Sequence, residues 1–87
     1  MISADDIKQR IESGLPGAEV QVRLDGNKCV VAVVSAAFEG QRAVKKQQLV
    51  YGCLNDIIAS GELHAVSMHT YTPAEWATQK KLGVPGL

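Results

Sequence analysis

Cysteine, proline and aromatic residues are scarce in this sequence. Of its 87 residues only two are cysteines and three are prolines, and aromatic residues make up 5%. Cys29 and Cys53 lie far apart, without a C-x-x-C arrangement. Neither a disulfide framework nor a self-contained zinc site is therefore predicted. We expect both cysteines to be free thiols in a reducing compartment.

An excess of charge is also missing. Nine basic and nine acidic residues cancel, so the global charge does not argue for nucleic-acid binding. No run approaches the ~20 apolar residues of a membrane span. The N-terminal stretch MISADDIKQRIES has acidic residues where a signal peptide needs a basic region. We expect a cytoplasmic protein that makes no contact with membranes.

Catalytic signatures are absent as well. The serines, aspartates and histidines fall into no recognisable nucleophile motif, and no stretch resembles a phosphate-binding loop. A chain of this length forms one domain that buries only somewhat more than ~60% of its unfolded surface. The sequence predicts a single domain over residues 1–87, with a short C-terminal tail at 83–87, that is not an enzyme.

Regular hydrophobic patterning is what the sequence does contain. Apolar residues at helical spacing, after a possible Ser3 cap, predict a first helix that ends near Pro16. The alternating segment AEVQVRL (residues 18–24) and the nearly continuous apolar run KCVVAVVSAAF (residues 28–38) predict two strands. The DGN segment between them predicts the turn of a hairpin.

A second helical pattern runs over residues 44–58, with Cys53 on its apolar face. Gly52 lies inside it, so the segment is one weakened helix or two joined helices. A strand over residues 63–71 follows, and then a helix capped at Thr72 with Trp76 packing onto the domain. The order αββα(α)βα predicts an α+β domain of two layers, with helices on one face of a three-stranded sheet.

Three segments, VVSAAFEG, VKKQQLVYGCL and LHAVSMHTYTPAEW, together resemble the BolA family, especially its IbaG branch. The resemblance covers nearly the whole chain, from the first helix to Leu82. It implies a class II KH-like fold and an adaptor without enzymatic activity. Family members share a [2Fe-2S] cluster with a monothiol glutaredoxin in iron-sulfur trafficking and iron homeostasis. Some are also described as DNA-binding regulators linked to stress and cell shape.

His64 matches the histidine that ligates the cluster in this family. Taken alone, a histidine at the beginning of a strand is more often a hydrogen-bonded structural residue, and the family resemblance is what favours ligation. His69 falls on the opposite face of the strand, and five strand residues span ~16 Å. One metal would not readily bind both imidazoles, so we interpret His69 as a surface or edge residue.

The second ligand departs from the family pattern. When the chain is aligned on VVS, the histidine of IbaG-like proteins falls at Lys28, whose ammonium has no lone pair for iron. Cys29 is the next candidate because a thiolate suits iron. A shift of one residue along a strand turns the side chain to the other face, however, so a buried apolar cysteine is the alternative unless the strand bulges.

One histidine and one candidate cysteine are fewer than the four protein ligands that iron-sulfur clusters usually need. The resemblance implies that the partner supplies a cysteine and a bound glutathione thiolate, and that the isolated protein holds no cluster. Cluster binding and heterodimer formation should then strengthen each other. The recipient of the cluster and the existence of a weak homodimer stay open.

Arg42, Lys45 and Lys46 form the densest basic cluster, near the start of the central helix. A solvated helix face is the simplest interpretation. In a KH-like fold such residues could instead contact nucleic-acid phosphates, or they could dock glutaredoxin or the carboxylates of glutathione. Zero net charge and the lack of a G-x-x-G loop oppose the nucleic-acid interpretation.

Overall fold

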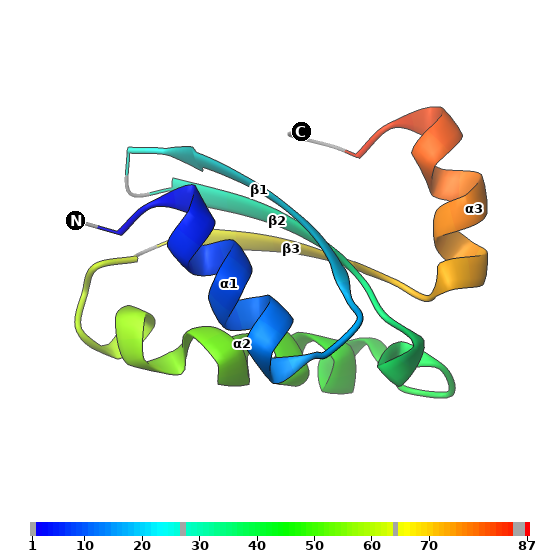
Figure 1. Cartoon of the computed structure of the whole chain (residues 1–87), viewed down its shortest axis with the longest axis horizontal. Helices are drawn as coiled ribbons and strands as arrows, with labels where there is room; N and C mark the ends of the chain where they lie inside the picture. Colours follow the sequence, from blue (N-terminus) through cyan, green and yellow to red (C-terminus); the bar gives the residue numbers. More distant parts are fainter. Residues whose placement is uncertain (1, 27, 64, 85–86) are drawn as a thin grey trace.

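The computed structural model describes residues 2–26, 28–63, 65–84 and 87. It confirms the predicted α+β fold and the predicted order of elements (Figure 1). In chain order these are helix α1 (Ala4–Gly14), strands β1 (Glu19–Asp25) and β2 (Lys28–Val34), the 3-10 helix η1 (Ala36–Phe38), helix α2 (Ala43–Ala59), strand β3 (Ala65–Tyr71) and helix α3 (Pro73–Leu82).

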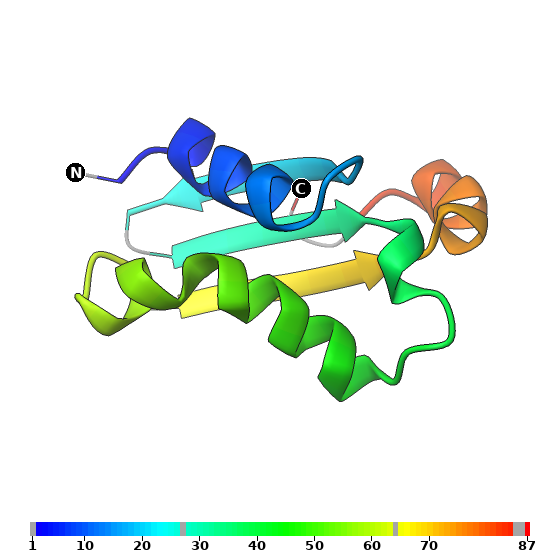
Figure 2. The same ribbon diagram turned by 60° about the horizontal axis from the view of Figure 1, so that its bottom comes forward.

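The three strands form one mixed sheet in the order β1-β2-β3. The hairpin partners β1 and β2 are antiparallel, whereas β2 and β3 are parallel. A parallel pair needs a long crossover connection, and here η1 and α2 provide it. Helices α1 and α2 lie on one face of the sheet, while α3 lies beyond the end of β3 (Figures 1 and 2).

The core lies between the sheet and the two helices that cover it. Ile7 and Ile11 of α1 and Leu54 and Ile57 of α2 are buried there in one cluster that includes the fully buried Val31 of β2. Burying a side chain of this kind stabilises a fold by about 1.5–3 kcal/mol. The helical spacing of these apolar residues thus explains why α1 and α2 lie where they do.

The second strand is shorter than the sequence predicts. We expected it to continue to residue 38, but β2 ends at Val34 and residues 36–38 form η1. The turn begins at Ser35, whose hydroxyl accepts a hydrogen bond from the Ala37 amide at 3.1 Å and whose carbonyl accepts one from the Phe38 amide at 3.2 Å. The turn carries Phe38 into the core, where it is fully buried.

The central helix is continuous. Of the two alternatives at Gly52, the structure shows a single helix from Ala43 to Ala59 that passes through this glycine. Both outer helices begin with the expected capping boxes. In α1 the Asp6 amide donates to the Ser3 hydroxyl, and in α3 the Glu75 amide donates to the Thr72 hydroxyl.

Helices α1 and α2 approach closely at Gly14 and Cys53. A Cβ atom placed on Gly14 would overlap the sulfur of Cys53, which donates to the Leu49 carbonyl at 3.3 Å. Gly14→Ala is therefore expected to lower the free energy of unfolding by about 1–3 kcal/mol, because overpacking displaces the neighbouring group. Denaturant unfolding followed by circular dichroism measures the loss.

The Cys53→Ala background provides the control. Once the sulfur is removed, the added methyl group at residue 14 has room, so the cost of Gly14→Ala should shrink to below about 0.5 kcal/mol. Equal costs in the two backgrounds would show that the sulfur does not determine the packing of α1 on α2.

Candidate functional site

The candidate ligand residues belong to the segments where β2 and β3 begin. Because these strands are parallel, their first residues lie side by side: Lys28 pairs with Ala65, and Cys29 pairs with Val66. The last residue of β1, Asp25, pairs with Lys28 from the other side. Lys28, Ala65 and Asp25 are exposed. This end of the sheet can therefore be reached by a second protein.

His64, the predicted iron ligand, lies outside the described residues. In the sequence it immediately precedes Ala65, the first residue of β3. The predicted ligand role of His64 stays a prediction.

Cys29 lies inside the core. Only 2% of its surface is exposed, and burial raises the pKa of its thiol. The pairing of Leu24 with Cys29 and of Cys29 with Val66 continues in regular register, so no bulge redirects the side chain. Iron binds the thiolate rather than the thiol. Burial and the raised pKa both favour the packing role of Cys29 over coordination.

The structure also places the second histidine and the second cysteine of the chain. His69 is half-buried within β3, where it pairs with Ala32. Cys53 packs partly against the core, and burial raises the pKa of its thiol too.

In the part of the chain that the structure describes, no group of three His, Cys, Asp or Glu side chains is placed to hold a metal ion. None of the described helices is long and apolar enough to span a membrane.

The basic cluster of Arg42, Lys45 and Lys46 surrounds the first turn of α2. Arg42 is the residue before the helix, and the first turn contains no acidic residue. Arg42 and Lys45 are exposed. The Lys46 ammonium lies 3.5 Å from the Glu75 carboxylate of α3, and only 15% of its side chain is exposed. Lys46 therefore links two helices, and the exposed cations of the cluster are Arg42 and Lys45.

The Glu75 carboxylate combines two roles. It accepts a hydrogen bond from the Thr72 amide at 2.8 Å, which closes the capping box of α3, and it pairs with Lys46. The hydrogen bond from the Thr72 amide and then the charge of Lys46 hold the pKa of Glu75 below its usual range.

Glu75→Gln should make the free energy of unfolding less dependent on pH in the acidic range. A carboxyl group whose pKa is lowered by folding stabilises the protein above its unfolded pKa of about 4.3, and this contribution is lost as the pH falls through the folded pKa. Glutamine keeps the cap but not the charge. We expect the variant to be less stable at pH 7 by about 0.2–1 kcal/mol, the range of exposed ion pairs, and the difference to vanish below the folded pKa.

Thermal unfolding between pH 7 and pH 3 measures this effect. Glu12→Gln, on the exposed side of α1, is the matched control and should change the free energy of unfolding at pH 7 by less than about 0.5 kcal/mol. A stability difference for Glu75→Gln that stays constant down to pH 3 would contradict the role of the charge.

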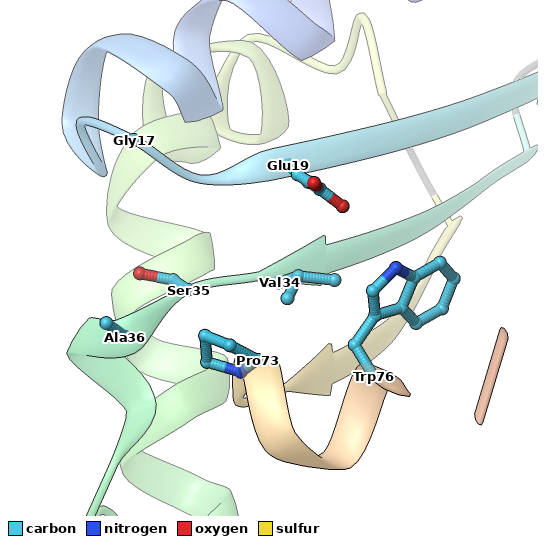
Figure 3. A pocket seen from close by; sticks show the side chains of 7 residues that line it. All are labelled: Gly17, Glu19, Val34, Ser35, Ala36, Pro73 and Trp76. Atoms are coloured by element: carbon cyan, nitrogen blue, oxygen red, sulfur yellow. The ribbon is translucent and has the colours of Figure 1, made fainter. Parts of the chain in front are cut away.

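A pocket that the sequence analysis did not find lies at the other end of the sheet. It is bounded by Glu19, Val34, Ser35, Pro73 and Trp76 (Figure 3). The prediction that Trp76 packs onto the domain is confirmed in part, because its ring lies 5.4 Å from that of Tyr71 and its side chain is half-buried. The residues come from β1, β2, η1 and α3 and from the turns next to them, so they are distant in the sequence and come together only in the folded chain.

Comparison with known proteins agrees with this architecture. The family model for BolA-like proteins matches residues 19–75. The chain is 45% identical over 78 residues to the acid stress protein IbaG of Escherichia coli, which covers 90% of this chain and 93% of that protein.

Two solved structures show the same fold. A bolA protein homologue from Coxiella burnetii is 40% identical, with a TM-score of 0.78 over 88% of this chain and 99% of that one. BolA1 from Arabidopsis thaliana is 29% identical, with a TM-score of 0.74 over 86% of this chain and 98% of that one.

Proposed function

Because the chain belongs to the BolA-like protein family, we propose that it is an adaptor that binds a [2Fe-2S] cluster jointly with a monothiol glutaredoxin. The observation that carries this proposal is the match of HAVS, residues 64–67, to the family's ligand motif, in which His64 directly precedes Ala65, the exposed first residue of β3. The proposed role is iron-sulfur trafficking and iron homeostasis in the cytoplasm, without catalysis by this chain.

The proposed ligand set is divided between two chains. His64 supplies an imidazole nitrogen, which is an established ligand of [2Fe-2S] iron. The glutaredoxin supplies its cysteine thiolate and a bound glutathione thiolate. Lys28 and Ala65 lie beside each other at the start of their strands, and both are exposed. A second protein can therefore contact the sheet at these two residues.

Cys29 is the second candidate ligand from this chain. Its side chain is buried in a regular strand pair, so it would reach iron only after the start of β2 had rearranged. Such a rearrangement would expose apolar core surface, which costs free energy at about 25 cal/mol for each Å². We therefore rank His64 first, and Cys29 stays a secondary candidate.

Reconstitution of the mixed complex tests the proposal. The protein is combined anaerobically with a monothiol glutaredoxin, iron, sulfide and glutathione, and then fractionated by size. We expect a heterodimer with visible absorption that differs from the spectrum of glutaredoxin reconstituted alone. A glutaredoxin that keeps its own spectrum and elutes separately would contradict the proposal.

A second candidate function is nucleic-acid binding at the start of α2. The observation that favours it is the pair of exposed cations in the basic cluster, Arg42 and Lys45, at a helix N-terminus without an acidic residue in the first turn, since both features attract phosphate. Lys45→Ala in combination with Arg42→Ala should then weaken DNA binding and flatten its salt dependence. Affinity no greater than that of a neutral control protein would eliminate this function.

A further inference from the structure

The pocket beside Trp76 is built from β1, β2, η1 and α3, which meet at one end of the sheet. Its volume is about 290 Å³. Val34, the last residue of β2, lies between Glu19 of β1 and Tyr71 of β3 in the strand register. Pro73 and Trp76 of α3 complete the opposite side (Figure 3). The pocket therefore has an apolar base and walls of different chemistry.

One wall is an aromatic ring in a fixed position. Trp76 packs against Tyr71, with ring centroids 5.4 Å apart and planes inclined by 44°. The helix that carries it begins with a complete capping box at Thr72 and Glu75, and the ion pair to Lys46 attaches that helix start to α2. The start of the helix that carries the indole is thus anchored before any ligand arrives, which lowers the entropic cost of binding.

The other wall carries a negative charge. Glu19 is exposed at the first position of β1, and Figure 3 shows its carboxylate across the opening from the Trp76 indole. Among the described residues, none forms an ion pair with Glu19. Gly17, in the turn before β1, has a φ of 84° and no neighbour within 4 Å of where a Cβ would stand, so this side of the pocket stays open.

A pocket that has a carboxylate on one side and an aromatic ring on the other is complementary to a cation. An indole attracts a cation over its face, and a carboxylate binds a guanidinium group through two parallel hydrogen bonds. A guanidinium is planar, stacks on aromatic rings and loses its water more readily than an ammonium group does. We propose that this pocket binds an arginine side chain presented by a protein partner.

The arginine pocket lies away from the proposed metal site. Val34 and Tyr71 are the last residues of their strands, whereas Lys28 and Ala65 are the first. Strands of this length separate the two ends by ~20 Å. Arginine binding therefore does not depend on the cluster, and it can be tested on the isolated protein whatever the outcome of the reconstitution experiment.

Trp76 provides the reporter, because it is the only tryptophan in the chain. Acetyl-arginine amide is titrated into the labelled protein at constant ionic strength while the indole N–H resonance is followed by NMR. Acetyl-citrulline amide, which has nearly the same shape without the charge, is the matched ligand. We expect a saturable shift with arginine and binding at least about threefold weaker with citrulline, as for an exposed ion pair.

Two variants test which carboxylate binds the guanidinium group. Glu19→Gln should weaken arginine binding by about threefold or more, whereas Asp25→Asn, an exposed residue of the same strand and the same face, should leave it unchanged. Equal binding of arginine and citrulline, equal effects of the two variants, or a shift that does not saturate would each overturn the proposal.

Discussion

Replacing His64 by alanine should abolish the distinctive visible spectrum of the mixed complex with glutaredoxin. The imidazole is the ligand that this chain is proposed to supply, and loss of even an outer partner of a metal ligand lowers metal affinity by about 10–100-fold. Loss of the ligand itself should have at least that effect. Absorption and circular dichroism spectra of the reconstituted mixture measure it, together with the amount of iron that elutes with the heterodimer.

His69→Ala is the matched control for this experiment. His69 is the only other histidine, and it is half-buried within β3 where it pairs with Ala32. The control variant should give the spectrum of the unaltered protein. If the two variants behave alike, the imidazole of residue 64 has no special role.

Cys29→Ser separates the two roles considered for that thiol. A ligand change from sulfur to oxygen would alter the spectrum of the mixed complex, whereas a packing role would affect only stability. Because Cys29 is buried and its thiol pKa is raised, we expect the spectrum to stay the same. An altered spectrum would instead show that the start of β2 rearranges to present the sulfur.

The largest effect on stability is expected from Phe38→Ala. Phe38 is fully buried on η1 and packs in the core. Truncation of a buried phenylalanine costs about 3–5 kcal/mol, which is a large fraction of the 5–15 kcal/mol available to a typical domain. Thermal unfolding should show a midpoint lower by more than about 10 °C, or no cooperative transition at all.

Tyr51→Ala is the aromatic control for the core. Tyr51 lies on the solvent side of α2 and is 45% exposed, and surface substitutions usually change stability by less than about 0.5 kcal/mol. Similar midpoints for the two variants would mean that η1 does not anchor the core as described.

Local sequence patterns predicted the helices and strands well because each pattern depends only on residues that are close together in the sequence. The helical spacing of Ile7 and Ile11 and the capping boxes at Ser3 and Thr72 all correspond to what the structure shows. The exception is the run after Val34. Apolar residues there are compatible with a strand or with a buried 3-10 turn, and the distinction depends on the hydrogen bonds that Ser35 makes.

Contacts between distant segments could not be predicted in the same way. Lys46 was expected to belong to a solvated basic face, but the arrangement of α3 brings Glu75 to it. The pocket between Glu19 and Trp76 likewise depends on the register of three strands. No local pattern in the sequence encodes these distances, although the isolated tryptophan was a usable signal that something packs against the start of the last helix.

The candidate metal site could be proposed only through the resemblance to a family. A histidine before a strand does not by itself indicate iron, and the two cysteines of this chain do not form a ligand motif. The family match singled out His64, and the structure shows that the neighbouring Cys29 is oriented toward the core by the regular strand pairing. The predicted departure from the family pattern at Lys28 is the reason why we propose that a partner supplies the remaining ligands.

The most direct test of this account is the affinity of glutaredoxin for the protein with and without the cluster. If the two chains share the metal centre, cluster loading must tighten the heterodimer, because binding free energies are reciprocally linked. We predict an affinity at least about tenfold higher in the loaded state, and loss of this gain in His64→Ala. Equal affinities in the loaded and the cluster-free state would contradict the shared coordination of iron.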